Sequence, residues 1–532
     1  MRRTRALVLA IITAFFVAAL AQAAFAADAV ESVPQGLYAL EDAGAYNRFT
    51  NFVGGYSLLV DKDMRADMSL SGVRATLESP GKRIDIFNQR LDDVSASAYI
   101  AYSNGFLSNW TDHYLEYNGT RDIGGRSVHV TLWSRGRLAR VDDDKCHYAC
   151  IDIPVGNNEY VTILMRSSAP LHQSGGYAYL AEGFRSLPKS AAEYVRKAKA
   201  VNLAYRNWNE ETETFYEHYF GLENPLTWGI FEPSAPGNFE PLLEHEALFD
   251  YNFPIILNYS TFENTYKHPN LSQRLESAHK NGRTLELTLQ TAAAQFPGES
   301  NMVYSILNGA YDEFLTDYAE TIAAFEHPVL FRLGNEMNGD WCPYAGYNTS
   351  RDPLVFVEFY RYVYGFFERA GARNVIWVWN PNGKSFPDFT WNDALMYYPG
   401  DEYVDVVGLT AYNTGNYYPG ETWKSFAELY DGIYYDYIEK YGKPLMITEF
   451  ASAVLGGDKN QWVLDMFAHI RYYDRIKVAV WWDGADYDQN GRIARNYFID
   501  DPDTLIETFR RSLRGAFDER PEDVLWKRDV FI

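Results

Sequence analysis

The chain contains few of the residues on which disulfide, metal and redox proteins depend. Only 3 of its 532 residues are cysteines, too few for a disulfide scaffold. Cys146 and Cys150 would lie about 13 Å apart in a straight strand, so a bridge between them requires a turn, and Cys342 has no evident partner. The ten histidines are scattered, and no H-E-x-x-H pattern occurs. We therefore expect neither a metal ion nor another cofactor.

Basic residues are also scarce relative to acidic ones. Lys and Arg number 48 against 71 Asp and Glu, which gives a net charge of −23. Such a field repels phosphate backbones, so we expect no nucleic-acid partner, and strongly anionic polymers are disfavoured as well. No G-x-S-x-G pattern occurs, which argues against a serine hydrolase. A neutral substrate is compatible with this negative charge.

Long hydrophobic runs are absent except at the N-terminus. A basic start, Met1–Arg5, precedes an apolar stretch from Ala6 to Ala21, and Ala24-Phe25-Ala26 has the small-x-small pattern of a cleavage site. We interpret residues 1–26 as a signal peptide. The mature protein would then be secreted (extracellular, periplasmic or associated with the cell envelope) and would have no membrane span. An uncleaved membrane anchor is the alternative, because the run is near spanning length.

Aromatic residues, by contrast, are abundant at 16%, and the pattern of apolar residues divides the chain. Residues 30–190 predict a β-rich, sandwich-like accessory domain, because Ser127–Trp133 and Tyr160–Met165 alternate or are β-branched between Gly- and Asn-containing turns. Residues 191–224 predict a helical connector, since apolar residues recur at helical spacing from Ala191 onward. We assign residues 516–532 to a C-terminal tail.

Residues 225–515 alternate short apolar strands with longer helical patterns. Eight strands separated by helices predict an α/β fold, a (β/α)8 TIM barrel. A doubly wound open sheet is the rival, but no Gly-rich phosphate loop follows the first strand. Since every strand falls after Pro225, we expect the barrel to fold on its own. The predicted strands are Thr227–Phe231, Pro254–Tyr259, Thr284–Leu289, Val329–Leu333, Val375–Trp379, Val404–Leu409, Leu445–Thr448 and Lys477–Trp482.

Two of these apolar strands end in a carboxylate. The fourth runs on to Glu336, and strand alternation would place Arg332, Gly334 and Glu336 on one side. The seventh ends in Glu449. Because barrel active sites lie at the C-terminal ends of strands, both carboxylates would face one bound ligand. A charged group at such a place is costly unless it is used or paired, so a salt-bridged structural glutamate is the alternative.

Two carboxyl groups across a cleft are what the cleavage of a glycosidic bond requires. One protonates the leaving oxygen, while the other attacks the anomeric carbon or activates a water molecule to do so. The pair therefore predicts a polysaccharide or oligosaccharide as the partner. Most of the aromatic residues are expected in the core or on the surface, and only those at strand ends are candidates for sugar contacts.

The strand ends also carry longer motifs. NEMNGDW at 335–341 follows the fourth strand, VIWVWNP at 375–381 covers the fifth, residues 398–413 cover the sixth, and ITEFA at 447–451 covers the seventh. This run resembles glycoside hydrolase family 26, a β-mannanase-like family of the clan A barrel glycosidases. The resemblance covers residues 225–514 and leaves out the first 190.

The resemblance implies a role for each of several residues. It assigns Glu336 as the acid/base and Glu449 as the nucleophile of a retaining mechanism. Tyr412 matches a tyrosine that hydrogen-bonds the nucleophile, and Trp341 matches an aromatic residue that lines the sugar site. A stacking platform is expected at the end of the eighth strand. The remaining candidate substrate-binding residues are Asn335, Arg332, Trp481 and Trp482, with Trp482 preferred over Trp481.

Asn335 departs from the family pattern, which has His at that place. Other clan A families use Asn there, so catalysis is not excluded, but the two side chains contact the reacting sugar differently. We predict a secreted retaining hydrolase that cleaves internal β-bonds of a neutral polysaccharide, with β-mannan favoured. The alternatives are a clan A hydrolase of β-glucan, β-xylan or an exopolysaccharide, and a non-catalytic polysaccharide-binding protein of the cell envelope. We expect a monomer whose N-terminal domain is a carbohydrate-binding or spacer module.

The segment Asp486–Arg492 has the D-x-D-x-N-G opening of a calcium loop. Its twelfth position is Tyr497, where a bidentate Glu is required. An Asx-rich loop beside the active site is therefore preferred over a calcium site.

Overall fold

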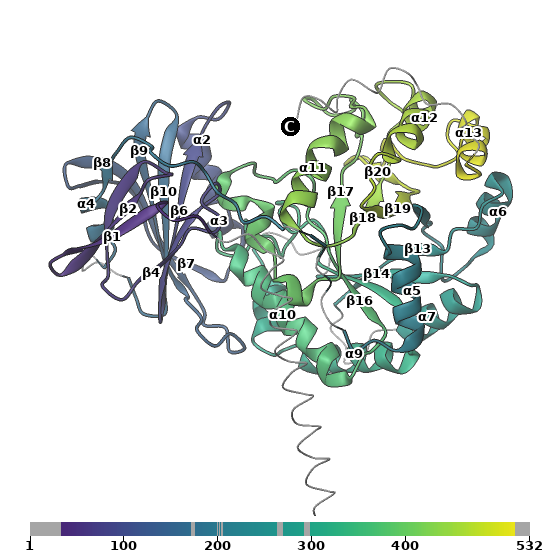
Figure 1. The fold of residues 1–532 in the computed structure, drawn as a ribbon, viewed down its shortest axis with the longest axis horizontal. Helices are drawn as coiled ribbons and strands as arrows, with labels where there is room; N and C mark the ends of the chain where they lie inside the picture. The colour runs from purple at the N-terminus through teal and green to yellow at the C-terminus, as the bar shows by residue number, and fades with distance from the viewer. Residues whose placement is uncertain are drawn as a thin grey trace, which may run out of the picture.

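The computed structural model has two domains that lie side by side, a purple-to-blue β-domain and a teal-to-yellow barrel (Figure 1). It describes residues 33–171, 176–198, 200–201, 203, 206–262, 270–291 and 298–515. The predicted signal peptide and C-terminal tail lie outside these residues. Within the described part of the chain, no helix combines the length and the apolar character needed to cross a membrane.

The N-terminal domain consists of two antiparallel sheets, as the alternating sequence predicts. One has the order β1-β2-β3-β11 and the other β4-β5-β6-β10-β9-β8-β7. Apolar side chains from both sheets form a single core between them. The strands are β1 (Tyr38–Ala43), β2 (Tyr46–Asn51), β3 (Tyr56–Val60), β4 (Arg65–Asp67), β5 (Ala75–Ser79), β6 (Lys82–Arg90), β7 (His113–Ile123), β8 (Arg126–Arg135), β9 (His147–Gly156), β10 (Glu159–Ser167) and β11 (Arg185–Ser186); the helices are α2 (Ala96–Ser103), α3 (Phe106–Asn109) and α4 (Ala178–Glu182).

The central strands of the seven-stranded sheet are buried on both of their faces. In β9 and β10, Ile151 and Ile163 pack in the core between the two sheets, whereas Cys150 and Leu164 belong to a second cluster that continues into the barrel. Antiparallel sheets commonly leave one face to water, so the second buried face shows that this domain is built against the barrel.

All three cysteines are buried and free. Cys150 lies within β9, and Cys146 immediately precedes that strand. The backbone between them is extended and makes no turn. Two cysteines four residues apart in an extended strand are too far from each other for a disulfide.

The prediction of a helical connector is wrong for the residues that join the two domains. Among the described residues 191–198, none is helical; Val195 instead forms an antiparallel bridge with Leu70, and the Arg196 N–H donates to the Ser69 carbonyl at 2.8 Å. Ala191 and Tyr194, two of the apolar residues that suggested a helix, pack against the sandwich core, which holds this backbone extended. The helical part of the connector is α5 (Glu210–Phe220), which is capped by the Asn209 side chain.

The C-terminal domain is a closed barrel of eight parallel strands, in the order β12 to β19. The predicted (β/α)8 fold is therefore confirmed, with each expected strand present to within two residues at either end. The strands are β12 (Thr227–Phe231), β13 (Ile255–Thr261), β14 (Thr284–Gln290), β15 (Val329–Leu333), β16 (Val375–Trp379), β17 (Val406–Thr410), β18 (Leu445–Phe450) and β19 (Ile476–Trp482); a small hairpin, β20 (Ala485–Tyr487) and β21 (Ile493–Asn496), follows.

Helices surround the barrel. They are α6 (Glu240–Phe249), α7 (Leu271–Lys280), α8 (Met302–Leu307), α9 (Asp312–Phe325), α10 (Pro353–Ala370), α11 (Phe426–Lys440), α12 (Lys459–Ile470) and α13 (Thr504–Leu513), with three short 3-10 turns at Thr390–Asn392, Ala394–Tyr397 and Asp401–Tyr403.

Helix α5 closes the end of the barrel at which the strands begin. Tyr216 and Phe220 of α5 pack into the interior cluster of the barrel, beside strand residues such as Ile255 and Val406. The Tyr216 hydroxyl donates to the carbonyl of Asp405, the residue before β17, at 3.1 Å. The opposite end, where the strands finish, is left for a site.

The two domains share a buried polar interface as well as a common apolar cluster. Arg166 of β10 forms ion pairs with Asp85 in its own sheet and with Asp352 of the barrel, the latter at 2.9 Å, and all three side chains are buried. In the opposite direction, Arg351 of the barrel donates a hydrogen bond to the hydroxyl of Tyr99 in the N-terminal domain at 2.8 Å. This joint core argues against our expectation that the barrel folds on its own.

We predict that Arg166→Met destabilises the whole protein by about 3–5 kcal/mol, because it leaves Asp352 buried without its cation, whereas Asp85 keeps its ion pairs with Arg83 and Arg74. The matched control is Arg90→Met, which breaks an ion pair with Asp92 whose side chains are 74% and 69% exposed and should cost less than about 1 kcal/mol. Urea unfolding of the full chain, followed by tryptophan fluorescence, measures both. Equal midpoints for the two variants would show that the interface adds no stability.

Candidate active site

Glu336 lies on a tight turn beyond the end of β15. Gly334 and Glu336 both adopt left-handed backbone conformations, with φ of +58° and +55°. The Glu336 N–H donates to the Asn380 carbonyl at 2.8 Å, which fixes the turn against the end of β16. The position of Glu336 does not follow from strand alternation, because β15 already ends at Leu333. A residue other than glycine adopts a positive φ only at a cost in backbone energy, and such strained residues are typical of functional sites.

Glu449 reaches the interior of the barrel through a bulge in β18. Leu409 pairs with Ile447, but the next residue of β17, Thr410, pairs with Glu449, so Thr448 is the extra residue. Such a bulge re-aims the side chain that follows it. As a result, Glu449 lies on the inner side and is only 4% exposed.

Arg332 is the cation that this buried carboxylate requires. It extends inside the barrel from β15, is fully buried, and its Nη2 donates to Glu449 Oε2 at 2.8 Å. Its Nε and Nη1 donate to Thr288 and Asn380 at 2.7 and 2.9 Å, so its direction is fixed. We predicted Arg332 as a substrate-binding residue; because no part of it is exposed, it positions Glu449 instead.

A second carboxylate, Glu286 of β14, lies 3.3 Å from Arg332 Nε and is completely buried. Burial raises its pKa to about 8, against the effect of Arg332. At neutral pH the glutamic acid form therefore dominates, and Glu449 supplies most of the negative charge that balances Arg332.

Sequence reasoning missed Tyr259. Its hydroxyl hydrogen-bonds Glu449 Oε2, the contact that we had assigned to Tyr412. Tyr412 lies in the same group of side chains, since its pKa is raised by burial and then by the charge of Glu449, but its ring packs against Trp482 and Tyr497. The strand pattern contained the necessary information, because Ile255, Leu257 and Tyr259 alternate along the inner face of β13.

The second carboxyl group has a different environment. Burial, and after it the negative charge of Glu449, raises the pKa of Glu336 to about 8. Trp341 Nε1 donates a hydrogen bond to Glu336 Oε2 at 3.2 Å. Glu449 is thus held by a cation and a hydroxyl donor, while Glu336 retains its proton at neutral pH.

Two of the predicted aromatic residues line this end of the barrel. Trp341 is 51% exposed and lies across Gly339, and Phe386 packs beside its ring at 5.3 Å. Trp482 is half-buried, stacks on Phe231 at 5.2 Å and lies over Gly484.

Trp481 was the other candidate on β19, and the structure shows that it is not part of the site. It is 1% exposed and packs between β19 and the outer helices, against Trp462 of α12 and Phe509 of α13. Consecutive residues of a strand point to opposite faces, so only one of the pair can reach the barrel mouth, and that residue is Trp482.

Asn335 is 7% exposed, and its backbone carbonyl and Oδ1 both accept from the Tyr344 hydroxyl, at 2.6 and 3.2 Å. Its amide is therefore fixed in direction beside Glu336.

The loop that carries these residues is also held by the N-terminal domain. Tyr102 hydrogen-bonds Asp340, and Trp110 Nε1 donates to Asn348 at 3.0 Å.

The Asp486 loop is an Asx turn between β20 and β21. Asp488 Oδ1 accepts from the N–H groups of Asn490 and Arg492 at 2.8 and 2.9 Å, and Asp486 pairs with Arg495. Among the described residues, the three-residue group of possible metal ligands lies elsewhere, at the opposite end of the barrel.

A (β/α)8 barrel that carries two carboxyl groups at the ends of its fourth and seventh strands, one favoured in its acid form and one paired with arginine, has the arrangement that cleavage of a glycosidic bond requires. Comparison with known families places the barrel more closely. Residues 285–472 match the model of glycosyl hydrolase family 26, so this part of the barrel is similar to that family.

Individual relatives match over parts of their length. Endoglucanase H of Acetivibrio thermocellus is 34% identical over 210 residues, which are 39% of this chain and 22% of that protein. A mannan endo-1,4-beta-mannosidase of Bacillus subtilis (strain 168) is 28% identical over 204 residues, 34% of this chain and 51% of that protein. This chain thus spans about half or less of the relatives it matches. The structure of a Bacillus subtilis mannanase is 20% identical, with a TM-score of 0.40, and covers 54% of this chain and 89% of its own.

We predict that Glu449→Gln lowers the pKa of Glu336 below its wild-type value of about 8, because it removes the nearby negative charge and frees the charge of Arg332. Carbon-13 NMR of protein labelled at the glutamate carboxyls measures this titration, with Glu336→Gln to assign the resonance. The control Glu276→Gln, at an exposed position of α7, should leave the titration unchanged. A Glu336 pKa near 4.5 in the wild type would contradict the geometry.

Proposed function

We propose that the protein is a retaining glycoside hydrolase that cleaves internal β-glycosidic bonds of a neutral polysaccharide, most favourably β-mannan. The observation that carries this proposal is the unequal environment of the two carboxyl groups. Burial and a neighbouring negative charge favour the acid form of Glu336, whereas Arg332 and Tyr259 stabilise the anionic form of Glu449.

Each group then has one role in the first step. Glu449 attacks the anomeric carbon, and the bond from that carbon to the leaving oxygen breaks as Glu336 gives its proton to that oxygen. The ester that forms neutralises Glu449, which lowers the pKa of Glu336. In the second step Glu336 takes a proton from water, the water oxygen attacks the anomeric carbon, and Glu449 leaves with its electron pair.

Trp341 and Trp482 support sugar binding at this end. Aromatic faces stack on the apolar face of a sugar ring, and both side chains are exposed enough to do so. Trp341 also donates to Glu336, so a sugar that moves this indole would affect the proton donor. The net charge of −23 favours neutral over anionic polymers.

Two observations bear on which sugar the protein cleaves, and they point to different polysaccharides. Four of the relatives are mannan endo-1,4-beta-mannosidases, which favours β-mannan. Asn335, in place of the family's His, and the relative named as an endoglucanase favour β-glucan as the second candidate. A β-1,3-xylanase among the relatives keeps β-xylan in the comparison, and exopolysaccharides remain a further possibility.

We also propose that the protein is secreted through the signal peptide at residues 1–26 and acts as a monomer. The N-terminal domain would act as a fixed part of the enzyme more than as a mobile module, because it shares a core with the barrel and its Tyr102 and Trp110 hold the loop that carries Glu336.

We predict that the wild-type protein releases reducing ends from one neutral β-polysaccharide, with an early fall in viscosity because internal bonds are cut. The panel consists of β-mannan, β-glucan, β-1,4-xylan and β-1,3-xylan. The double variant Glu336→Gln/Glu449→Gln, which keeps the shape of the site, should release none. Binding to a polymer in affinity electrophoresis with no reducing ends from any polymer would favour a polysaccharide-binding protein.

We predict that Glu336→Ala lowers polysaccharide hydrolysis about 10²–10⁴-fold, while a dinitrophenyl glycoside of the preferred sugar still reacts in the first step, because its leaving group needs no proton. Azide should then attack the glycosyl-enzyme and give the β-glycosyl azide. Glu449→Ala should lose the first step for every leaving group. The stereochemistry of the products, followed by proton NMR, decides the roles.

The surface variant Glu276→Ala is the control for this series and should behave as wild type. Retention corresponds to carboxyl groups about 5–5.5 Å apart. Hydrolysis with inversion by the wild type, or a β-glycosyl azide from Glu449→Ala, would remove Glu449 as the nucleophile.

A further inference from the structure

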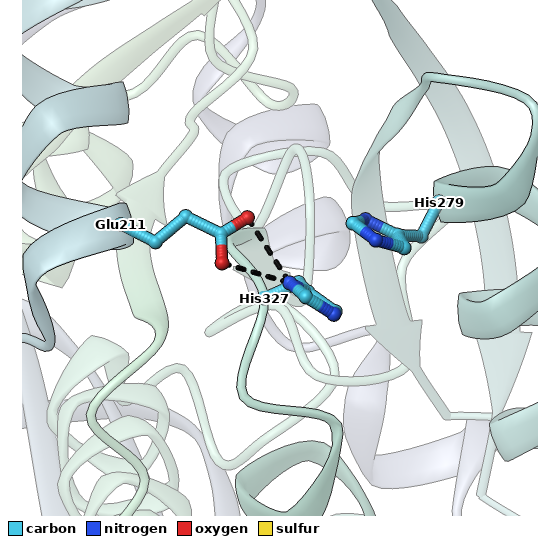
Figure 2. A group of neighbouring side chains, drawn as sticks. All are labelled: Glu211, His279 and His327. Carbon is cyan, nitrogen blue, oxygen red and sulfur yellow. Dashed lines mark hydrogen bonds and ion pairs between the residues drawn. The ribbon is translucent and has the colours of Figure 1, made fainter.

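A second group of ligating side chains lies at the end of the barrel opposite to the carboxylates. It consists of Glu211, His279 and His327, and each offers an atom that lies within 4.8 Å of the atoms of the other two (Figure 2). His327 Nδ1 lies 2.8 and 3.0 Å from the two carboxylate oxygens of Glu211. The rings of His279 and His327 are stacked, with centroids 3.6 Å apart and planes within 12°.

These side chains come from three separate segments whose backbones are fixed. Glu211 lies in the first turn of α5, His279 in the last turn of α7, and His327 in the connection from α9 to β15. The Asn209 side chain caps α5 and also donates to the Glu326 carbonyl at 2.6 Å, while Asn374 donates to the His327 carbonyl at 2.9 Å. The tertiary structure therefore holds the group together independently of the side chains themselves.

The group also faces open space. A pocket of about 290 Å³ is lined by all three residues together with His218, Tyr219 and Arg283. The side chains of Glu211 and His327 are 53% and 35% exposed. An ion and its water ligands can reach this pocket, and the exposed side chains can rotate to meet them.

Two imidazoles and one carboxylate are a ligand set for a divalent transition metal, and zinc in particular takes three such protein ligands with water in the fourth position. Zinc–ligand distances are about 2.0–2.2 Å, so the three donor atoms must move closer than they are. The exposed side chain of His279 can rotate out of its stack to bring its donor atom closer to the Glu211–His327 pair.

We propose that Glu211, His279 and His327 form a zinc-type metal site that joins α5, α7 and the α9–β15 connection. Helix α5 closes the base of the barrel through Tyr216 and Phe220. A metal bound there stabilises the folded state, because the three ligands come together only when the barrel is formed. The site is separate from the carboxylates of the proposed hydrolase, and its tests do not depend on hydrolysis.

The test is the binding of ZnCl₂ to the full chain after treatment with a chelator, by isothermal titration calorimetry and thermal unfolding. We expect one equivalent of zinc, and a rise in Tm of about 3 °C or more at a hundredfold excess over Kd. His279→Gln/His327→Gln should lose both. His218→Gln, which changes a histidine of the same pocket outside the group, should keep both.

Co²⁺ added to the wild-type protein provides a second measurement that needs no variant, because cobalt with nitrogen and oxygen ligands in a four-coordinate site gives intense visible absorption bands. Zinc should displace these bands. Far-UV circular dichroism checks that the double variant is folded. Absence of the cobalt bands in the wild type, or an unchanged zinc stoichiometry in the folded double variant, would overturn the proposal.

Discussion

The ion pair between Arg332 and Glu449 is the interaction on which the site depends. A carboxylate buried inside a hydrophobic barrel is strongly unfavourable without a cation, and Arg332 is the fully buried cation that contacts it. The other donors of this guanidinium bind Thr288 of β14 and Asn380 after β16, so one side chain from β15 connects four segments of the barrel. Since burial keeps Glu286 largely protonated at neutral pH, the charge of Arg332 is not shared between two carboxylates.

The same pair explains why two glutamates at similar strand ends differ chemically. The negative charge of Glu449 is compensated locally, yet it still raises the pKa of Glu336, which accepts a hydrogen bond from the neutral indole of Trp341. A charged neighbour disfavours a second negative charge in the same enclosure, and the cation lies beside Glu449 and not beside Glu336. The difference in role is thus a consequence of which strand carries the arginine and of the bulge that turns Glu449 toward it.

The N-terminal domain belongs to this arrangement. Its seven-stranded sheet covers the barrel with a buried face, and the Arg166 and Arg351 contacts cross the boundary in both directions. Tyr102 and Trp110 then fix the loop that contains Glu336 and Trp341. A rigid scaffold behind an active-site loop limits the positions that the acid/base residue can adopt, so the domain contributes to the geometry of the site without supplying a reacting group.

The sequence by itself determined the eight strands, the helices between them and the two carboxylates, because these follow from local periodicity and from the ends of apolar runs. It did not determine that Tyr259 rather than Tyr412 binds Glu449, that Arg332 is a positioning residue, or that Trp482 faces the mouth while Trp481 does not. It also missed the extended connector at residues 191–198 and the group of Glu211 and the two histidines. These features depend on strand register, on a one-residue bulge and on contacts between segments far apart in the chain, which only the tertiary structure decides.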